Sequence, residues 1–215
     1  MHIINPYRYA AAGGGIPVVE AFQTTTGVNN ITVTAPAGIT SGEMLLILIS
    51  IDGSAGSVST PAGWTELTVE SGGGCYNYTF YKISDGTETD VTIVGATTGN
   101  KAAFYIRVSA SSIDVSGTSS SSTGFSHAIT EVTTIVDNCL AFYSLAFDGA
   151  DTTSLNVSGT GWSESGYAQS GSGSVGITSC WGTKEMATAG ATGTATVAST
   201  SGDGASNCQF AIAPA

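Results

Sequence analysis

The stretch MLLILISIDG occupies residues 44–53, and the loop after it ends in GWTE at residues 63–66. The same arrangement returns as LAFYSLAFDG at residues 140–149 and GWSE at residues 161–164. In both places a largely apolar run ends in Asp-Gly, and the next loop ends in Gly-Trp, a hydroxyl residue and Glu. Such a run is far shorter than the ~20 residues of a membrane-spanning helix and fits a buried strand. The chain therefore contains an internal duplication built on a core strand.

The separation between equivalent positions grows along the chain and never shrinks. Small loop insertions in a duplicated unit produce such a drift, whereas chance matches would vary in both directions. We pair the following positions, with separations of 96, 98, 100 and 104 residues: Asp52 with Asp148, Trp64 with Trp162, Tyr81 with Trp181, and Phe104 with Cys208.

Alternation of apolar and polar residues runs through most of the chain. Residues 30–34, 104–108 and 208–212 are examples, and a period of two is typical of strands with one buried face. The strand formers lie between clusters of Gly, Ser, Asn and Asp, as in sandwiches and barrels. Only residues 184–189 suggest a helix, of a single turn. We predict an all-β fold with two tandem β-sandwich repeats of jelly-roll-like type.

We divide the chain into an N-terminal arm (residues 1–20), a first β-sandwich repeat (21–110), a linker (111–125) and a second β-sandwich repeat (126–215). The linker is rich in Ser, Gly and Thr, which bury little apolar area, so it is expected to be flexible. A repeat of about 90 residues buries only ~60–65% of its unfolded surface. We therefore expect the repeats to pack together or against other subunits.

The N-terminal arm begins with apolar and aromatic residues and continues into a glycine-rich tether. Such a segment is costly to leave in water, so it is expected to dock on another surface. Docking on another subunit and completion of the first sandwich by the same chain are both open. The residues expected to bind the partner are Ile3, Ile4, Pro6, Tyr7, Arg8 and Tyr9.

Charge in this chain is scarce and acidic. Charged residues make up 10% of the sequence, with 5 Lys+Arg against 16 Asp+Glu and a net charge of −11. Nucleic acid is not an expected partner, because phosphate contacts need clustered Lys and Arg and the five basic residues are scattered. Neither an export signal nor a membrane-spanning run is visible, so no membrane contact is predicted.

Catalytic and cofactor motifs are missing from the sequence. The histidines are His2 and His127, and no nucleophile elbow, zinc spacing or phosphate-binding loop surrounds them. Residues 171–176 match GxGxxG by letter, but no helix follows to face a pyrophosphate, so we interpret them as a turn. The loops after Asp148 and at residues 85–90 offer oxygen atoms without the spacing of a calcium loop. We predict no cofactor, no metal and no enzyme activity.

The four cysteines form no CxxC pair. Their number permits two disulfides, but we favour reduced, strand-borne apolar residues of a protein made in a cytosol. They are Cys75, Cys139, Cys180 and Cys208.

The repeated carboxylates receive a structural interpretation. Asp52 and Asp148 each end a core strand, and Glu66 and Glu164 each follow a tryptophan. Two carboxylates suffice for glycoside hydrolysis. A feature that recurs once per repeat is nevertheless explained by the repeated fold, since Asp before Gly caps tight turns.

The repeated tryptophans have two interpretations. Trp64 and Trp162 could stack on sugar rings from the loops of the sandwich. A large ring at an equivalent place in both repeats is more simply a plug at the end of each sandwich core. The sequence leaves both the glycan-facing and the core alternative open.

Several of these motifs resemble a known family. PAGWT at residues 61–65, between a Leu/Ile-rich strand and a later Tyr81-Lys82 pair, resembles the P-x-G-W-T β-sandwich repeats of tailed-phage virion proteins. The opening INPYRYA at residues 4–10 is similar to N-termini that anchor short phage structural proteins. The second repeat lacks the proline and has Gly159 and Thr160 before its Gly-Trp, so its loop is expected to differ.

The resemblance implies a non-enzymatic structural protein of a virion, assembled in the host cytoplasm. We expect a capsid decoration or cement protein that docks on the major capsid protein through its arm, as a homo-oligomer and by analogy a trimer. The alternative is a tail-tip or fibre protein that binds host-surface glycans. A glycan-binding or glycan-processing module that acts alone is a third hypothesis.

Overall fold

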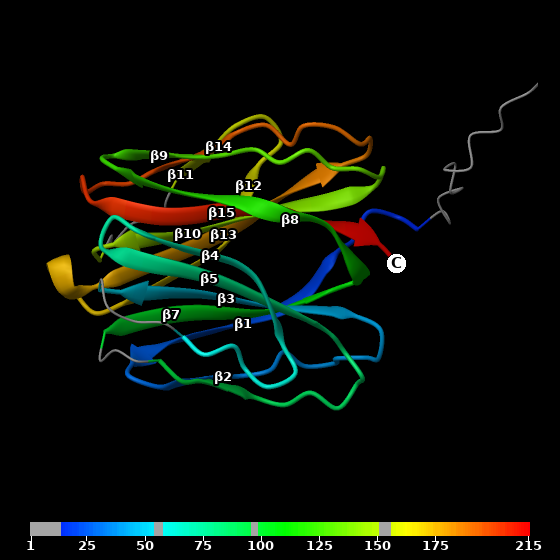
Figure 1. Cartoon of the computed structure of the whole chain (residues 1–215), viewed down its shortest axis with the longest axis horizontal. Coiled ribbons are helices and arrows are strands. Elements are labelled where there is room, and N and C mark those ends of the chain that lie inside the picture. The colour runs from blue at the N-terminus through cyan, green and yellow to red at the C-terminus, as the bar shows by residue number, and fades with distance from the viewer. Residues whose placement is uncertain (1–13, 54–57, 96–98, 151–155) are drawn as a thin grey trace, which may run out of the picture.

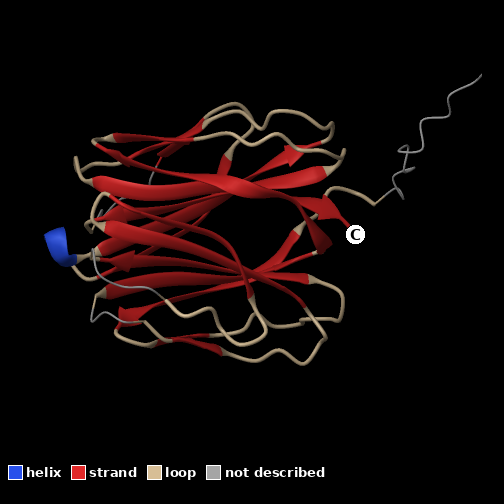
Figure 2. Ribbon diagram, viewed as in Figure 1, coloured by secondary structure: helices blue, strands red, loops and turns tan. Residues whose placement is uncertain are grey.

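The computed structural model of the chain describes residues 14–53, 58–95, 99–150 and 156–215. Within these ranges the regular structure is strand apart from one short 3-10 turn, η1 (Gly173–Val175), as Figure 2 shows. The prediction of an all-β fold is confirmed.

Two five-stranded antiparallel sheets form the centre of the molecule. Across the first sheet the order is β1 (Val19–Val28), β7 (Asn100–Val108), β3 (Met44–Asp52), β5 (Cys75–Ile83) and β4 (Thr65–Gly72). Across the second it is β8 (Ala110–Thr123), β15 (Gly204–Pro214), β10 (Cys139–Asp148), β13 (Ile177–Met186) and β12 (Ser163–Ser170).

Two short sheets accompany the five-stranded ones. One pairs β2 (Ile31–Val33) with β6 (Val91–Ile93), and the other joins β11 (Asn156–Ser158), β14 (Ala195–Ala198) and β9 (Ser126–Ile129). Figure 1 shows the layers stacked from β2 at the bottom, through the two five-stranded sheets, to β9 and β11 at the top. The chain thus forms a stack with the two large sheets face to face in the middle.

The first half of the chain (β1–β7) and the second half (β8–β15) use their strands in the same order. In each large sheet the first strand of the half (β1 or β8) pairs with the last (β7 or β15). The last strand pairs with the long apolar strand (β3 or β10), which pairs with the hairpin that follows the Gly-Trp loop (β5 and β4, or β13 and β12). Contacts between the large sheets are reciprocal, because β4 packs on β8 and β15 while β12 packs on β1 and β7. Equivalent surfaces therefore meet, as in an isologous dimer interface.

The two long apolar strands are buried on both faces. In β3, Leu46 and Leu48 point into the central core, while Leu45 and Ile47 point into an outer core under the short sheet. Successive side chains of a strand point to opposite faces, so a strand in the middle of a stack reads as a continuous apolar run. The apolar run of β3 from Met44 to Ile49 is the direct result.

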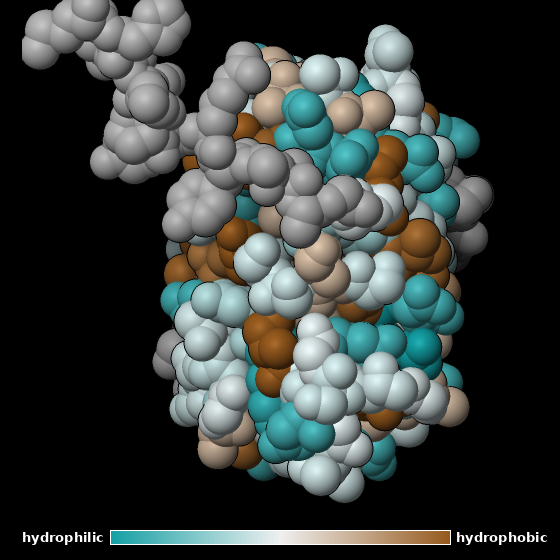
Figure 3. All heavy atoms as spheres, turned by 90° about the vertical axis from the view of Figure 1, so that its right-hand side faces the viewer, coloured by the Kyte–Doolittle hydropathy of each residue, from teal (hydrophilic) through white to brown (hydrophobic). Residues whose placement is uncertain are grey.

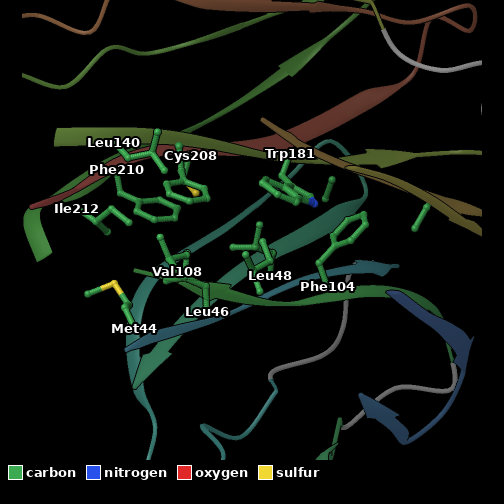
Figure 4. Packing of buried hydrophobic residues seen from close by; sticks show 14 of the residues in the cluster. Met44, Leu46, Leu48, Phe104, Val108, Leu140, Trp181, Cys208, Phe210 and Ile212 are labelled. Atoms are coloured by element: carbon green, nitrogen blue, oxygen red, sulfur yellow. The ribbon is translucent and has the colours of Figure 1, made fainter. Parts of the chain in front are cut away.

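The central core joins the two halves of the chain. Figure 4 shows side chains of the two large sheets pointing toward one another across it. The labelled members are Met44, Leu46, Leu48, Phe104 and Val108 from the first sheet and Leu140, Trp181, Cys208, Phe210 and Ile212 from the second. The expectation that the repeats pack together holds for these residues.

The prediction of a flexible linker at residues 111–125 is wrong. Most of this segment belongs to β8, which pairs with β15 along the edge of the second large sheet. An edge strand gains its stability from backbone ladder bonds and can carry polar side chains on its solvent face. Here the hydroxyls also find partners: Ser120 donates to Asn207 Oδ1 at 2.8 Å and Thr118 to the carbonyl of Thr130 at 3.0 Å.

The helical turn suggested for residues 184–189 is also absent, because β13 continues to Met186 in register with Cys139. Pairing with β10 overrides the local helix propensity of the segment.

The pairing of Tyr81 with Trp181 needs correction. Thr79 lies opposite Thr68, and Trp181 lies opposite Gly166, so Thr79 is the counterpart of Trp181. The hairpin turn of residues 171–176, with η1 in it, is longer than the two-glycine turn at residues 73–74. The extra residues that the second half has between β12 and β13 all lie in this turn. The pairing of Tyr81 with Trp181 places some of them further along the chain.

Candidate functional site

The arm residues Ile3, Ile4, Pro6, Tyr7, Arg8 and Tyr9 lie outside the described residues. The described chain starts beside its last residue. A Cβ on Gly14 would meet the carbonyl oxygen of Ala215 at 2.8 Å, and the Gly14 carbonyl accepts from Asn138 Nδ2 at 3.4 Å. Figure 3 views this end, where hydrophobic residues lie scattered among polar ones on the visible surface.

The two repeated tryptophans sit on turns of the same shape. Trp64 N donates to the Pro61 carbonyl at 3.0 Å, and Trp162 N donates to the Gly159 carbonyl at 3.2 Å. The residue before each is a glycine with φ near +80° (79° at Gly63 and 80° at Gly161), a conformation that favours glycine. The turns therefore present both indoles in the same way.

The surroundings of the two indoles differ. Each makes an edge-to-face contact with a tyrosine, Trp64 with Tyr105 at 5.4 Å and Trp162 with Tyr143 at 5.7 Å between ring centroids. Trp162 is only 7% exposed and belongs to the outer core of the second half. Trp64 is half-buried and borders an open pocket. For Trp162 the core interpretation is the one that the structure favours.

The pocket beside Trp64 has a volume of about 350 Å³ and lies between the loop before β4 and the loop before β6. One part of its wall is apolar and the other is polar. The lining residues are Pro61, Ala62, Trp64, Lys82, Thr87, Glu88, Thr89, Asp90, Val91, Thr92 and Tyr105.

Glu88 organises the polar wall. Its carboxylate accepts from the Ser84 hydroxyl, from the backbone N–H of Asp85 at 2.9 Å, and from the Lys82 ammonium at 3.0 Å. Burial alone would raise the pKa of Glu88, but these hydrogen bonds outweigh it and lower the pKa to about 2. Glu88 is therefore an ionised anchor of its own loop.

Tyr105 contributes a buried hydroxyl without a partner. The residue is fully buried, and its hydroxyl makes no hydrogen bond. Burial raises the pKa of Tyr105, and the nearby negative charges of Glu88 and Asp90 raise it further. The phenol is thus neutral, and its hydroxyl is a buried donor without an acceptor in a residue that lines the pocket.

The corresponding loop of the second half is closed over its tryptophan. Trp162 Nε1 donates to the Gly193 carbonyl at 3.2 Å. Lys184, which occupies the place of Lys82, donates to the Thr192 carbonyl at 2.6 Å instead of pairing with a carboxylate. Residues 187–194 contain no charged side chain. The same framework therefore holds a core residue in one half and a pocket residue in the other.

The repeated aspartates meet one another where the two halves join. In its protonated form Asp148 donates a side-chain hydrogen bond to Asp52. Burial raises the pKa of Asp148 to about 6, helped by the charges of Asp52 and Asp203 and by this hydrogen bond, while burial also raises the pKa of Asp52. The sequence did not predict this contact. The duplication makes Asp52 and Asp148 equivalent residues, but it does not say that the two lie next to each other where the halves meet.

The glutamates after the tryptophans do not join this pair. Glu66 is exposed, whereas burial raises the pKa of Glu164, whose Oε2 has no hydrogen-bond partner.

The interface between the large sheets contains polar side chains that bond to one another. Ser50 donates to Ser179 at 2.6 Å. Asn77, with its amide oriented so that both ends are satisfied, donates to Ser144 at 3.2 Å and accepts from the backbone N–H of Ala146 at 3.0 Å. The Cys75 thiol approaches the Ala146 carbonyl at 3.4 Å. Buried polar groups with such partners cost little and fix how the two sheets align.

The described histidine, His127, and the four cysteines are packed inside. Burial lowers the pKa of His127, whose ring lies between the hydroxyls of Ser122 at 2.9 Å and Ser199 at 3.4 Å. All four cysteines are free and buried, namely Cys75, Cys139, Cys180 and Cys208. Burial raises the pKa of each of the four thiols.

The loop at residues 85–90 uses its carboxylates in hydrogen bonds to the protein backbone. Asp85 Oδ1 accepts from the backbone N–H of Thr87 at 2.9 Å, and Asp90 Oδ1 accepts from that of Ala35 at 2.9 Å. Over the described ranges, no three His, Cys, Asp or Glu side chains gather in a way that could hold a metal ion. Asp151 of the other weighed loop lies outside the described residues.

Comparisons with known proteins give no match: no family model, no curated protein and no solved structure is similar to this chain. Among the described residues there is also no helix of the length and apolarity that crossing a bilayer requires.

Proposed function

We propose that the protein is a non-enzymatic structural component of a tailed-phage virion, and specifically a capsid decoration protein that docks on the head through its N-terminal arm. The resemblance of PAGWT (residues 61–65) and of the opening INPYRYA (residues 4–10) to phage structural proteins suggests the setting. The observation that carries the non-enzymatic part is the packing of reactive groups. His127 and the four cysteines, which are the usual bases and nucleophiles, serve the core in the described chain.

The shape of the described chain supports a role as a rigid block. The two large sheets share one apolar core, and the polar side chains between them are bonded to one another, so the halves resist sliding. A rigid block favours tight binding through an anchoring segment, because the folded part is already ordered and loses little conformational entropy when the segment binds. The arm, whose docking residues come from the sequence alone, supplies the contact.

The test is reconstitution on particles that lack this protein. The full chain should bind to the heads and saturate them, whereas a variant without residues 1–13 should remain folded and fail to bind. A matched control replaces Tyr7 and Tyr9 with Ser and keeps the length of the arm, and it should bind far less than the full chain. Full occupancy by the truncated chain would reject the arm as the anchor.

The open pocket at Trp64 favours one second candidate, a tail-tip or fibre protein that binds host glycans. Immunogold labelling of intact particles separates the two locations. Label over the head supports decoration, and label confined to the tail transfers the proposal to adsorption. Absence of label from purified particles would reject both.

A further inference from the structure

We propose that the pocket beside Trp64 is a binding site for an uncharged saccharide, which lays one face of a pyranose ring on the indole and directs hydroxyls to the polar wall. The inference is independent of where the protein sits on a particle, because a single chain forms the whole pocket. At about 350 Å³ the pocket lies at the small end of the ~300–1,000 Å³ range typical of small-ligand sites.

The two parts of the wall match the two sides of a sugar. Trp64, Pro61 and Ala62 provide an apolar surface, of which the half-buried indole is part. The loop before β6 adds hydroxyl and carboxylate groups, among them Thr89 and Asp90. A pyranose has an apolar C–H face and a ring of hydroxyls at its edge, so it can satisfy both surfaces at once, as aromatic side chains with a polar neighbour commonly do.

The polar wall is built before any ligand arrives. Glu88 and Lys82 are held at 3.0 Å from each other, and Glu88 is further fixed by backbone N–H groups of its loop. Asp90 Oδ1 accepts a hydrogen bond from the backbone N–H of Ala35. This bond fixes the carboxylate and leaves Oδ2 for a ligand hydroxyl. Pre-organised groups of this kind lose little freedom on binding.

The Tyr105 hydroxyl is the group that most directly indicates a ligand. A buried hydroxyl without a hydrogen bond costs free energy, and a ligand oxygen that accepts from it would remove that cost. Its position beside Glu88 and Asp90 places it on the polar side of the pocket.

The charges of the wall argue for a neutral ligand. Lys82 and Glu88 compensate each other, so the wall carries little net charge apart from Asp90. An anion would meet Asp90, and an organic cation would meet the Lys82 ammonium. A cation also prefers a cage of several aromatic faces, whereas the two aromatic residues that line this pocket, Trp64 and Tyr105, meet edge to face at 75° and form no such cage.

The second half supplies an internal control. Tyr143 also has a buried hydroxyl without a partner and also contacts a tryptophan by its edge, but Trp162 is covered by the loop of Gly193. Tyr105→Phe and Tyr143→Phe are therefore the same chemical change at comparable burial, and only the first is next to the pocket.

The experiment is calorimetric titration of the full chain with glucose, galactose, N-acetylglucosamine and their β-1,4-linked disaccharides, with tetramethylammonium as the cationic probe. At least one sugar should bind saturably. Tyr105→Phe should weaken that binding about fivefold to tenfold, the value of one lost hydrogen bond, while Tyr143→Phe leaves it unchanged. Trp64→Ala should abolish it, and Trp64→Phe should retain part of it.

Three results would overturn the proposal: no saturable binding by any sugar of the panel, equal effects of Tyr105→Phe and Tyr143→Phe, or sugar binding that survives Trp64→Ala. Saturable binding of tetramethylammonium alone would assign the pocket to cations instead. Thermal unfolding of every variant shows whether a loss of binding reflects a loss of fold.

Discussion

The two Gly-Trp loops of this molecule have turns of the same shape, but one tryptophan is covered by a neighbouring loop and the other borders an open pocket. In the second half the loop before β14 covers Trp162 and accepts its indole N–H. In the first half the loop before β6 folds around the charged pair of Lys82 and Glu88 and leaves Trp64 at the edge of a pocket. The two halves of a duplicated framework can thus keep the same strand pairing while the equivalent tryptophan is a core residue in one half and a pocket residue in the other.

The largest effect that separates the copies should come from the tryptophans themselves. Trp162→Ala removes a buried ring and should cost about 3–5 kcal/mol of unfolding free energy, whereas Trp64→Ala, at a half-buried site, should cost about 1–2 kcal/mol. Urea unfolding of the two variants measures the difference. Equal losses would mean that both indoles are core residues and would remove the contrast between the loops.

The charged loop of the first half should be the next largest contributor. Glu88→Gln breaks the bonds to Lys82 and to the loop backbone and should cost about 1–3 kcal/mol at pH 7. Because the pKa of Glu88 is lowered to about 2 from an ordinary 4.5, its stabilisation is present above pH 4.5 and is lost as the pH falls toward 2. Unfolding curves from pH 2 to 7 should show this loss in the parent chain. Glu88→Gln should remove this part of the acid dependence, and a matching loss in the variant would point to other carboxylates.

The aspartate pair between the halves should respond to pH in the opposite direction. The pKa of Asp148 is raised to about 6, so the folded state prefers the protonated form, and stability should fall as the pH rises from about 4 through 6. Asp148→Asn should abolish this fall and stabilise the chain at pH 7 by about 1 kcal/mol, a modest value because half-exposed charges are screened. Parent and variant are compared by unfolding at pH 4 and pH 7. A variant less stable than the parent at pH 7 would show that the ionised pair is favourable.

The smallest effect is expected at two buried tyrosines, Tyr105 in β7 and Tyr143 in β10, which are not at equivalent positions of the duplication but carry the same group without a partner. Tyr105→Phe and Tyr143→Phe each delete a buried hydroxyl without a partner, so neither should lose stability and each should gain up to about 1 kcal/mol. Thermal unfolding of both variants in the absence of any ligand provides the measurement. A clear loss in one of them would reveal a hydrogen bond, through water for example, that distinguishes its site.

The sequence predicted the features that depend on period and repetition. The apolar runs at residues 44–53 and 140–149 indicated central strands, and the recurring Asp-Gly and Gly-Trp pairs indicated a duplication. The structure has the same strand order in both halves. Local pattern carries this information because a strand buried on both faces is apolar at nearly every position, with Ser50 and Ser144 as the buried polar exceptions here.

The sequence did not predict which residues of the two halves contact each other. The pairing of Asp52 with Asp148 depends on how two sheets face each other, and no spacing records that. The polar composition of residues 111–125 suggested a linker, because composition reports burial and not backbone pairing. The sequence also did not predict the opening at Trp64. Trp64 and Trp162 share the pattern of a preceding Gly, a following hydroxyl residue and a Glu, and the difference arises from the later loops at residues 84–90 and 187–194.

The meeting of Gly14 with Ala215 has a practical consequence for engineering. A reporter or affinity tag fused after Ala215 would emerge beside the base of the N-terminal segment and would compete with it for any surface that the segment binds. The turn at η1 lies at the opposite end of the molecule from Ala215 (Figure 2). A peptide inserted next to Ser174 in that turn would be displayed away from both ends of the described chain, which makes it the better place for a label in labelling or display experiments.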